Sequence, residues 1–161
     1  MIKITPYKVI YQSSIDKMML EISEEFDKQI FSKPTNTTPL VPKLYWVAIK
    51  NNVVIGTVGV IPINGEFAVL KRMMLIKKFR GSEFGISKLL LYTVIEWCRE
   101  NGLSKIFLGT MSQFKAAQAF YKKNGFHTIN EGELPIDFIK NSLDTVFFQL
   151  NLDANDINEA F

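Results

Sequence analysis

The sequence predicts an α/β (α+β) fold with a mixed central sheet, in which an antiparallel meander is followed by a β-α-β crossover. Three apolar runs, at 44–49, 53–61 and 67–75, are joined by Asn51-Asn52 and Asn64-Gly65, which are typical of tight hairpin turns. The third run leads through a basic loop into a helical apolar pattern, and a further apolar run follows that pattern. A helix between two strands of one sheet favours parallel strands.

Composition limits the class of protein. A chain of 161 residues with 47% hydrophobic and 22% charged content fits one domain, expected at 1–150, followed by a polar tail at 151–161. The formal charge of +3 is concentrated around the central loop, which favours a small anionic ligand over nucleic acid. The single cysteine, Cys98, rules out a disulfide within the chain and favours a reducing compartment.

The ends of the chain bear on where the protein acts. The N-terminal residues 1–6 lack the features of a signal peptide, and no apolar run reaches the roughly 20 residues that span a bilayer. We therefore expect a cytoplasmic protein without a membrane partner. The apolar run at 145–150 either ends the domain or pairs with a second copy, so the sequence allows a monomer or a homodimer.

The first elements are an edge strand and a helix. Residues 2–11 predict a strand that Pro6 confines to an edge, because proline cannot donate to a ladder. From Ser14 to Ile30 the apolar residues follow helical spacing, with Ser13 or Ser14 as the cap. The segment 32–42 has three prolines and predicts a loop that is either a connector or a substrate lid.

The elements after the meander carry clear end signals. Apolar spacing predicts a helix that starts after Gly85 and is closed by Asn101-Gly102, and a second helix that ends at Asn124-Gly125. This second helix is predicted at 112–123. The remaining predicted elements are a buried strand at 105–110, two final strands at 126–129 and 145–150, and an irregular segment at 130–141.

The central loop has the chemistry of an anion site. It runs from Leu75 to Ser87 between a strand and a helix. The free backbone N–H groups at the start of a helix, together with the helix dipole, favour an anionic ligand there. Gly81 and Gly85 let the backbone approach phosphate, and Arg80 adds charge. The loop lacks both G-x-G-x-x-G and the Walker Lys-Ser/Thr pair, and an antiparallel meander precedes it, which argues against Rossmann and P-loop folds.

These motifs carry a family resemblance. The stretches Leu75-x-Lys77-x-x-Arg80-Gly81, Gly85-Ile86-Ser87-x-x-Leu90-Leu91 and Ala117-x-x-Phe120-Tyr121-x-x-x-Gly125-Phe126 resemble the acetyl-CoA-binding motifs of the GNAT (GCN5-related) N-acetyltransferases. The resemblance runs from about Trp46 to Phe126. It implies helices on both faces of the sheet, acetyl-CoA as cofactor, no metal, and direct attack of an amine on the thioester. The loop is about two residues longer than the family pattern.

The resemblance also implies which residues meet the cofactor. The pantetheine arm would lie along the strand at 73–75 and the strand at 107–110, bonded like an added strand. The acetyl carbonyl would lie near the backbone N–H of Met74 or Leu75. The full set is Met73, Met74, Leu75, Arg80, Gly81, Ser82, Phe84, Gly85, Ile86, Ser87, Thr110, Lys115 and Ala117.

The expected catalytic residues are Tyr121 and Glu66. The family places its general acid at the position of Tyr121, and a phenol can lend a hydrogen bond or a proton to a leaving thiolate. The other interpretation is a tyrosine packed under the helix for structure alone. Glu66 begins the central strand, and Val69 stands at the mid-strand position where related sequences often have a carboxylate. The alternative to direct contact is a water chain that ends at one of the acids Glu66, Glu24, Glu25, Glu131 and Glu133. His127 is expected to be structural or exposed.

Three functions follow. The first is an N-acetyltransferase that moves acetyl from acetyl-CoA to a primary amine of a small molecule or amino acid. The second is the same chemistry on a protein or peptide. The third is a non-catalytic acyl-CoA-binding module, which Val69 keeps open because it removes the usual carboxylate.

Overall fold

The structure is a computed structural model that describes residues 1–26, 44–81, 83, 85–138 and 140–152. The predicted loop at 32–42, predicted cofactor residues Ser82 and Phe84, and residues 153–161 of the predicted tail therefore lie outside the described residues. In the described ranges, no helix has the length and apolar character needed to cross a membrane.

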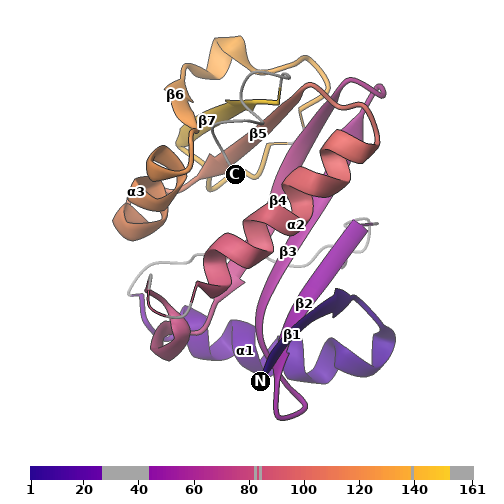
Figure 1. The fold of residues 1–161 in the computed structure, drawn as a ribbon. Helices are drawn as coiled ribbons and strands as arrows, with labels where there is room; N and C mark the ends of the chain where they lie inside the picture. Colours follow the sequence, from indigo (N-terminus) through magenta and orange to yellow (C-terminus); the bar gives the residue numbers. More distant parts are fainter. Residues whose placement is uncertain (27–43, 82, 84, 139, 153–161) are drawn as a thin grey trace. The chain divides into compact units, whose positions relative to one another are not determined.

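Seven strands form one mixed sheet in the order β1-β2-β3-β4-β5-β7-β6 (Figure 1). The first four strands are neighbours in chain order, β5 runs parallel to β4, and β7 is antiparallel to both β5 and β6. This confirms the predicted meander followed by a crossover. The elements are β1 Ile2–Pro6, α1 Gln12–Ser23, β2 Leu44–Lys50, β3 Val53–Ile63, β4 Phe67–Leu75, α2 Ile86–Glu100, β5 Lys105–Thr110, α3 Lys115–Lys123, β6 His127–Ile129 and β7 Val146–Asn151.

The chain forms two compact units. The first comprises Met1–Ile61 and Lys71–Glu96, and the second comprises Pro62–Leu70 and Trp97–Phe161. The prediction of a single domain at 1–150 stays a prediction.

The first unit contains the start of the meander. Strand β1 pairs with β2 from Ile2 opposite Lys50 to Pro6 opposite Trp46, and it lies at the edge of the sheet. The predicted strand is therefore shorter than 2–11, because Pro6 ends it and a 3-10 turn follows at Val9–Tyr11. The residues of the Asn51-Asn52 turn have φ of 51° and 64°, which is the left-handed pair that a tight hairpin needs.

Helix α1 packs through Ile15, Met18 and Ile22, which are buried as their spacing predicts. The predicted serine cap is wrong: the capping residue is Tyr11, with no side-chain hydrogen bond. The hydroxyl of Ser14 instead accepts a hydrogen bond from the backbone N–H of Val54 at 2.9 Å. The helix also ends at Ser23, earlier than its apolar pattern predicts.

The second unit contains the crossover. The first half of β4 pairs in parallel with β5, from Phe67 opposite Lys105 to Val69 opposite Phe107. Helix α3 starts at Lys115, three residues later than predicted, and ends at Lys123. Gly125 follows with a φ of 95°, and the Phe126 N–H then donates to the Tyr121 carbonyl at 3.0 Å. One core cluster of this unit contains Phe107, Ile129 and Phe147, with Phe67, Leu134 and Phe138 packed against it.

Candidate functional site

In the first unit, the link between β4 and α2 has the backbone that an anion loop needs. After a 3-10 turn at Lys77–Phe79, Gly81 has φ of 115° and Gly85 has φ of 64°. Side chains other than glycine rarely adopt this region, so both positions favour glycine. A Cβ at either glycine would meet no atom of the described residues within 4 Å, so these residues leave the space beside the backbone open.

The start of α2 supplies backbone donors. The first bond of this helix runs from Leu89 N–H to the Gly85 carbonyl at 3.1 Å, so the N–H groups of 86–88 have no acceptor within the helix. The first turn of α2 contains no acidic residue, so nothing in it offsets the positive end of the helix dipole. This helix start therefore fits a diphosphate group.

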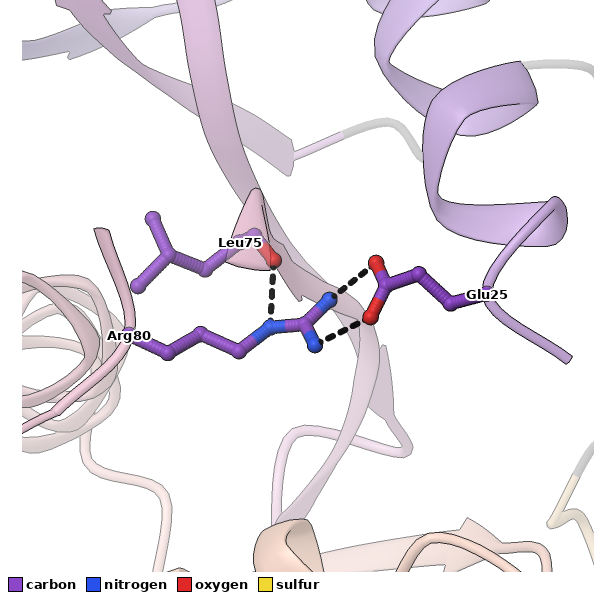
Figure 2. Close-up of polar contacts among 3 residues, drawn as sticks. All are labelled: Glu25, Leu75 and Arg80. Atoms are coloured by element: carbon purple, nitrogen blue, oxygen red, sulfur yellow. Dashed lines mark hydrogen bonds and ion pairs between the residues drawn. The ribbon is translucent and has the colours of Figure 1, made fainter. Parts of the chain in front are cut away.

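Arg80 makes a different contact from the one the sequence suggested. Figure 2 shows its guanidinium bonded to Glu25 at 2.6 and 2.9 Å, while its Nε donates to the Leu75 carbonyl at 2.8 Å. Arg80 thus ties the chain just after α1 to the end of β4. The loop lysines make other contacts. Lys77 is exposed, whereas the ammonium groups of Lys78 and Lys50 lie 5.2 and 5.0 Å from the centre of the buried Phe79 ring.

Strands β3 and β4 approach very closely at Gly56. A Cβ there would lie 2.9 Å from the Met74 carbonyl oxygen and 3.0 Å from the Leu75 side chain. Only glycine allows this approach without a shift of β4. Gly56 was not among the site residues predicted from the sequence, although a glycine inside an apolar strand is the signal for a close backbone contact. Met73 and Met74 are half-buried, and Leu75 is buried.

In the second unit, Tyr121 lies in an aromatic cluster at the end of α3. Its side chain is buried, with ring centroids 5.5 Å from Phe126 and 5.8 Å from Phe148. Burial raises the pKa of the Tyr121 phenol well above its ordinary value, and the negative charge of Asp144 raises it further. The phenol therefore stays protonated at neutral pH, as a proton donor must.

Asp144 reaches this place because Gly109 leaves room for it. A Cβ at position 109 would lie 2.5 Å from the Asp144 Oδ2 atom. Neither residue was among the site residues predicted from the sequence. The glycine inside the predicted strand at 105–110 was the available signal.

Strand β5 has a half-paired end. Its ladder with β7 runs to Thr110, whereas its ladder with β4 stops at Phe107. The Thr110 carbonyl accepts a hydrogen bond from Thr145 N–H at 2.9 Å on the β7 side. Among the described residues, 108–110 therefore have ladder partners on one side only, which is the arrangement that strand-like ligand binding requires. Lys115 is exposed and Ala117 is half-buried, both on α3.

The structure does not bring Glu66 and Tyr121 together. Glu66 is exposed in the turn between β3 and β4, and its carbonyl accepts a hydrogen bond from Ser104 N–H at 2.8 Å. Glu66 is thus level with the beginning of β5. Asp144, whose charge acts on Tyr121, lies against Gly109. Gly109 is five residues beyond Ser104, a separation of about 16 Å along the strand at the usual rise per residue.

A hollow of about 330 Å³ lies in the first unit, between the start of α1, the β2–β3 turn and Ile76. None of the predicted cofactor residues that the structure describes line it. The geometry of the β4–α2 loop, rather than this hollow, is therefore the basis of the candidate site.

Comparison with known proteins identifies the family. The model of the acetyltransferase (GNAT) family matches residues 13–126. Human N-acetyltransferase 8 is 30% identical over 116 residues, covering 70% of this chain and 51% of that protein. The N-acetylaspartate synthetase of Danio rerio is 33% identical over 124 residues, covering 74% and 41%. The chain spans about half the length of these curated relatives.

Solved structures show the same fold. A GNAT acetyltransferase of Staphylococcus aureus Mu50 superposes with a TM-score of 0.78 at 28% identity, covering 95% of this chain and 100% of that chain. A GNAT acetyltransferase of Elizabethkingia anophelis, solved with acetyl-CoA bound, has a TM-score of 0.58 at 18% identity, with coverage of 94% and 98%. Acetyl-CoA is the usual co-substrate of these enzymes, as the sequence motifs predicted. Because the family model matches more than half of its residues, this chain belongs to the GNAT family of acetyltransferases.

Proposed function

We propose that the protein transfers acetyl from acetyl-CoA to a primary amine of a small molecule or an amino acid. The observation that carries this proposal is the start of α2, where backbone donors without helical acceptors follow two left-handed glycines and no acidic residue lies in the first turn. Family membership supplies the co-substrate that fits it.

The residues present fit acetyl-CoA. The N–H groups of 86–88 would hold the diphosphate, with Lys77 and Lys78 adding positive charge. The one-sided end of β5 at 108–110 would bond the pantetheine arm. The backbone N–H of Met74 or Leu75 would contact the acetyl carbonyl oxygen. We give Arg80 the separate task of fixing the loop, because its guanidinium is already bonded to Glu25 and Leu75.

Tyr121 is the proposed general acid. Acetyl-CoA would supply a thioester, whose carbonyl carbon the amine nitrogen of the acceptor would attack as the carbon–sulfur bond breaks. The Tyr121 hydroxyl would give its proton to the leaving sulfur. The proton lost from the amine would pass to water, and Tyr121 would take a proton back from water. Glu66 has no part in this scheme, because it lies at the other end of β5 from Asp144.

An amino-acid acceptor has some support from the relatives, since one of them is named N-acetylaspartate synthetase. A non-catalytic acyl-CoA-binding module is the second candidate, because the mid-strand position where related sequences often have a carboxylate holds fully buried Val69. We expect action in the cytoplasm, the compartment that a lone reduced cysteine favours.

A coupled pair of measurements tests the proposal. Calorimetry with CoA reports cofactor binding, and CoA release from acetyl-CoA is followed against amines, amino acids and peptides, with hydrolysis in the absence of amine as the control. We expect binding together with release that depends on one class of amine. Binding without any release would favour the module, release with peptides alone would favour the protein acetyltransferase, and no binding would reject the assignment.

A further inference from the structure

A buried polar cluster in the first unit lies outside the cofactor loop. It is formed by Tyr45 on β2, Thr57 on β3 and Arg72 on β4. Tyr45 is only 5% exposed, and its buried hydroxyl has no hydrogen-bond partner in the part of the chain that the structure describes. A buried polar group without a partner costs stability, so such a hydroxyl calls for an explanation.

Arg72 has an unusual backbone for a strand residue. Its φ is 52°, in the left-handed region that residues other than glycine rarely adopt. Its carbonyl oxygen accepts a hydrogen bond from the hydroxyl of fully buried Thr57 at 2.7 Å. An irregularity of this kind redirects a side chain, and strained backbone is retained where function requires it. The strand is therefore distorted at the position of this guanidinium.

The guanidinium of Arg72 has a weak hydrogen-bond acceptor among the described residues around it. Its Nη1 donates to the sulfur of Met19 at 3.5 Å, and sulfur is a weak acceptor. Within the described ranges, no carboxylate forms an ion pair with it. Arg72 is also half-buried, so part of its charge is removed from water. Among the described residues, this guanidinium therefore has no anionic partner.

Tyr45 and Arg72 are close enough to act on one ligand. Burial raises the pKa of the Tyr45 phenol, while Thr57 and the positive charge of Arg72 lower it in part. The phenol thus stays a donor at neutral pH. A planar guanidinium fork can bind the two oxygens of a carboxylate through paired hydrogen bonds, and the O–H donor beside it can add a third. A phosphate can be held by the same fork, so it is the alternative that the test includes.

We propose that Arg72 and Tyr45 bind a carboxylate of the acceptor, so that the substrates are amines that also carry a carboxylate, such as amino acids. This inference rests on the proposed acetyltransferase function, whose acceptor it specifies. Arg72 provides the fork, Tyr45 donates a third hydrogen bond, and the bond from Thr57 to the Arg72 carbonyl holds the distorted strand in place.

The test compares amines that differ by the carboxylate alone. Leucine is paired with isoamylamine, phenylalanine with phenethylamine, and further amino acids with their decarboxylated amines, while phosphoethanolamine and ethanolamine report a phosphate preference. Binding is measured by calorimetry in saturating CoA, and KM and kcat by CoA release. The variants are Arg72→Gln, Arg72→Lys and Tyr45→Phe. The controls are Lys3→Gln, which removes an exposed charge, and Tyr7→Phe, which removes the hydroxyl of the ring 5.5 Å from Tyr45.

We expect the native protein to bind the carboxylate member of at least one pair ~10-fold or more tightly, as a charge-assisted bidentate contact would give. Arg72→Gln should abolish that preference through KM, Arg72→Lys should restore part of it, Tyr45→Phe should reduce it several-fold, and both controls should keep it. Equal binding within every pair, a preference that survives Arg72→Gln, or a stronger phosphate preference would overturn the inference.

The design separates this inference from the proposed function. If no amine is acetylated, the acetyltransferase proposal fails, while the binding measurements still decide whether Arg72 and Tyr45 select carboxylates. If Arg72→Gln does not fold, as judged by circular dichroism, Tyr45→Phe decides, because it removes a single oxygen atom that has no partner in the described structure.

Discussion

Arg80 and Glu25, 55 residues apart in the chain, form a two-pronged ion pair with contacts of 2.6 and 2.9 Å (Figure 2). The same guanidinium bonds the Leu75 carbonyl, so one side chain joins the segment after α1 to the last residue of β4. Three of the five N–H groups of the Arg80 guanidinium therefore bond the protein. We regard it as a residue that positions the loop.

The first prediction follows from this pair. Glu25→Gln should lower the free energy of unfolding by about 0.5–1 kcal/mol, the range for a partly exposed ion pair, and weaken CoA binding several-fold by loosening the loop. Arg80→Gln should have the same effects, and the double variant should add little, because both changes remove one interaction. Urea denaturation and calorimetry on the four proteins measure this. A far larger loss of CoA affinity in Arg80→Gln than in Glu25→Gln would instead mean that Arg80 contacts the phosphate groups of CoA directly.

Gly56→Ala tests the close approach of β3 and β4. The added methyl would meet the Met74 carbonyl at 2.9 Å, which is backbone and cannot swing aside, so β4 must shift. We expect a loss of about 1–3 kcal/mol in the free energy of unfolding. Gly132→Ala is the matched control, since a Cβ there meets nothing within 4 Å. Equal stability of the two variants in urea would contradict this account of Gly56.

The elements predicted best were those with local signals. Strands β4 and β5 have the predicted bounds, and the turn residues Asn64 and Gly65 have the expected left-handed φ of 52° and 68°. These outcomes depend on a few adjacent residues, whose turn chemistry and apolar spacing are visible in the sequence.

The failures came from distant partners. Ser14 reads as a helix cap, yet its hydroxyl bonds Val54, which lies 40 residues away. The Glu25 partner of Arg80 and the Asp144 neighbour of Tyr121 have no local signature either, because the fold alone sets such contacts. Glu66 was expected to act as the base because it begins the central strand. Its carbonyl bonds the Ser104 N–H, which places Glu66 beside the start of β5.

The third prediction concerns Tyr121. Tyr121→Phe should lower kcat by ~10²-fold, the usual worth of a general acid, and leave the Kd for CoA unchanged, since the phenyl ring keeps its contacts with Phe126 and Phe148. Steady-state kinetics and calorimetry measure the two quantities. Tyr92→Phe on α2 is the control and should retain activity. Unchanged kcat in Tyr121→Phe would assign the tyrosine to packing alone.

The raised pKa of Tyr121 also predicts how kcat and folding stability depend on pH. Burial and Asp144 disfavour the phenolate in the folded state, so the proton donor persists through pH 10, the ordinary phenol pKa. The kcat profile should therefore show no falling limb from this group below pH 10. Folding stability linked to Tyr121 is fully present below that pH and is lost as pH rises above it, because the unfolded chain ionises first. A falling limb near pH 8 that Tyr121→Phe removes would contradict this.

Cys98 provides the last prediction. Its side chain is fully buried in α2, and burial raises the pKa of the thiol to about 12. Since the thiolate is the reactive form, the native protein should resist an aromatic disulfide reagent at pH 8 and react fully in urea, where the thiol regains a pKa of about 8.5. The stability linked to this thiol is present below the unfolded pKa and declines as pH rises toward the folded one. Rapid labelling of the folded protein would mean that α2 opens locally at Cys98. Slow labelling would make free CoA the dominant thiol in the release assay, so the same reagent can follow turnover.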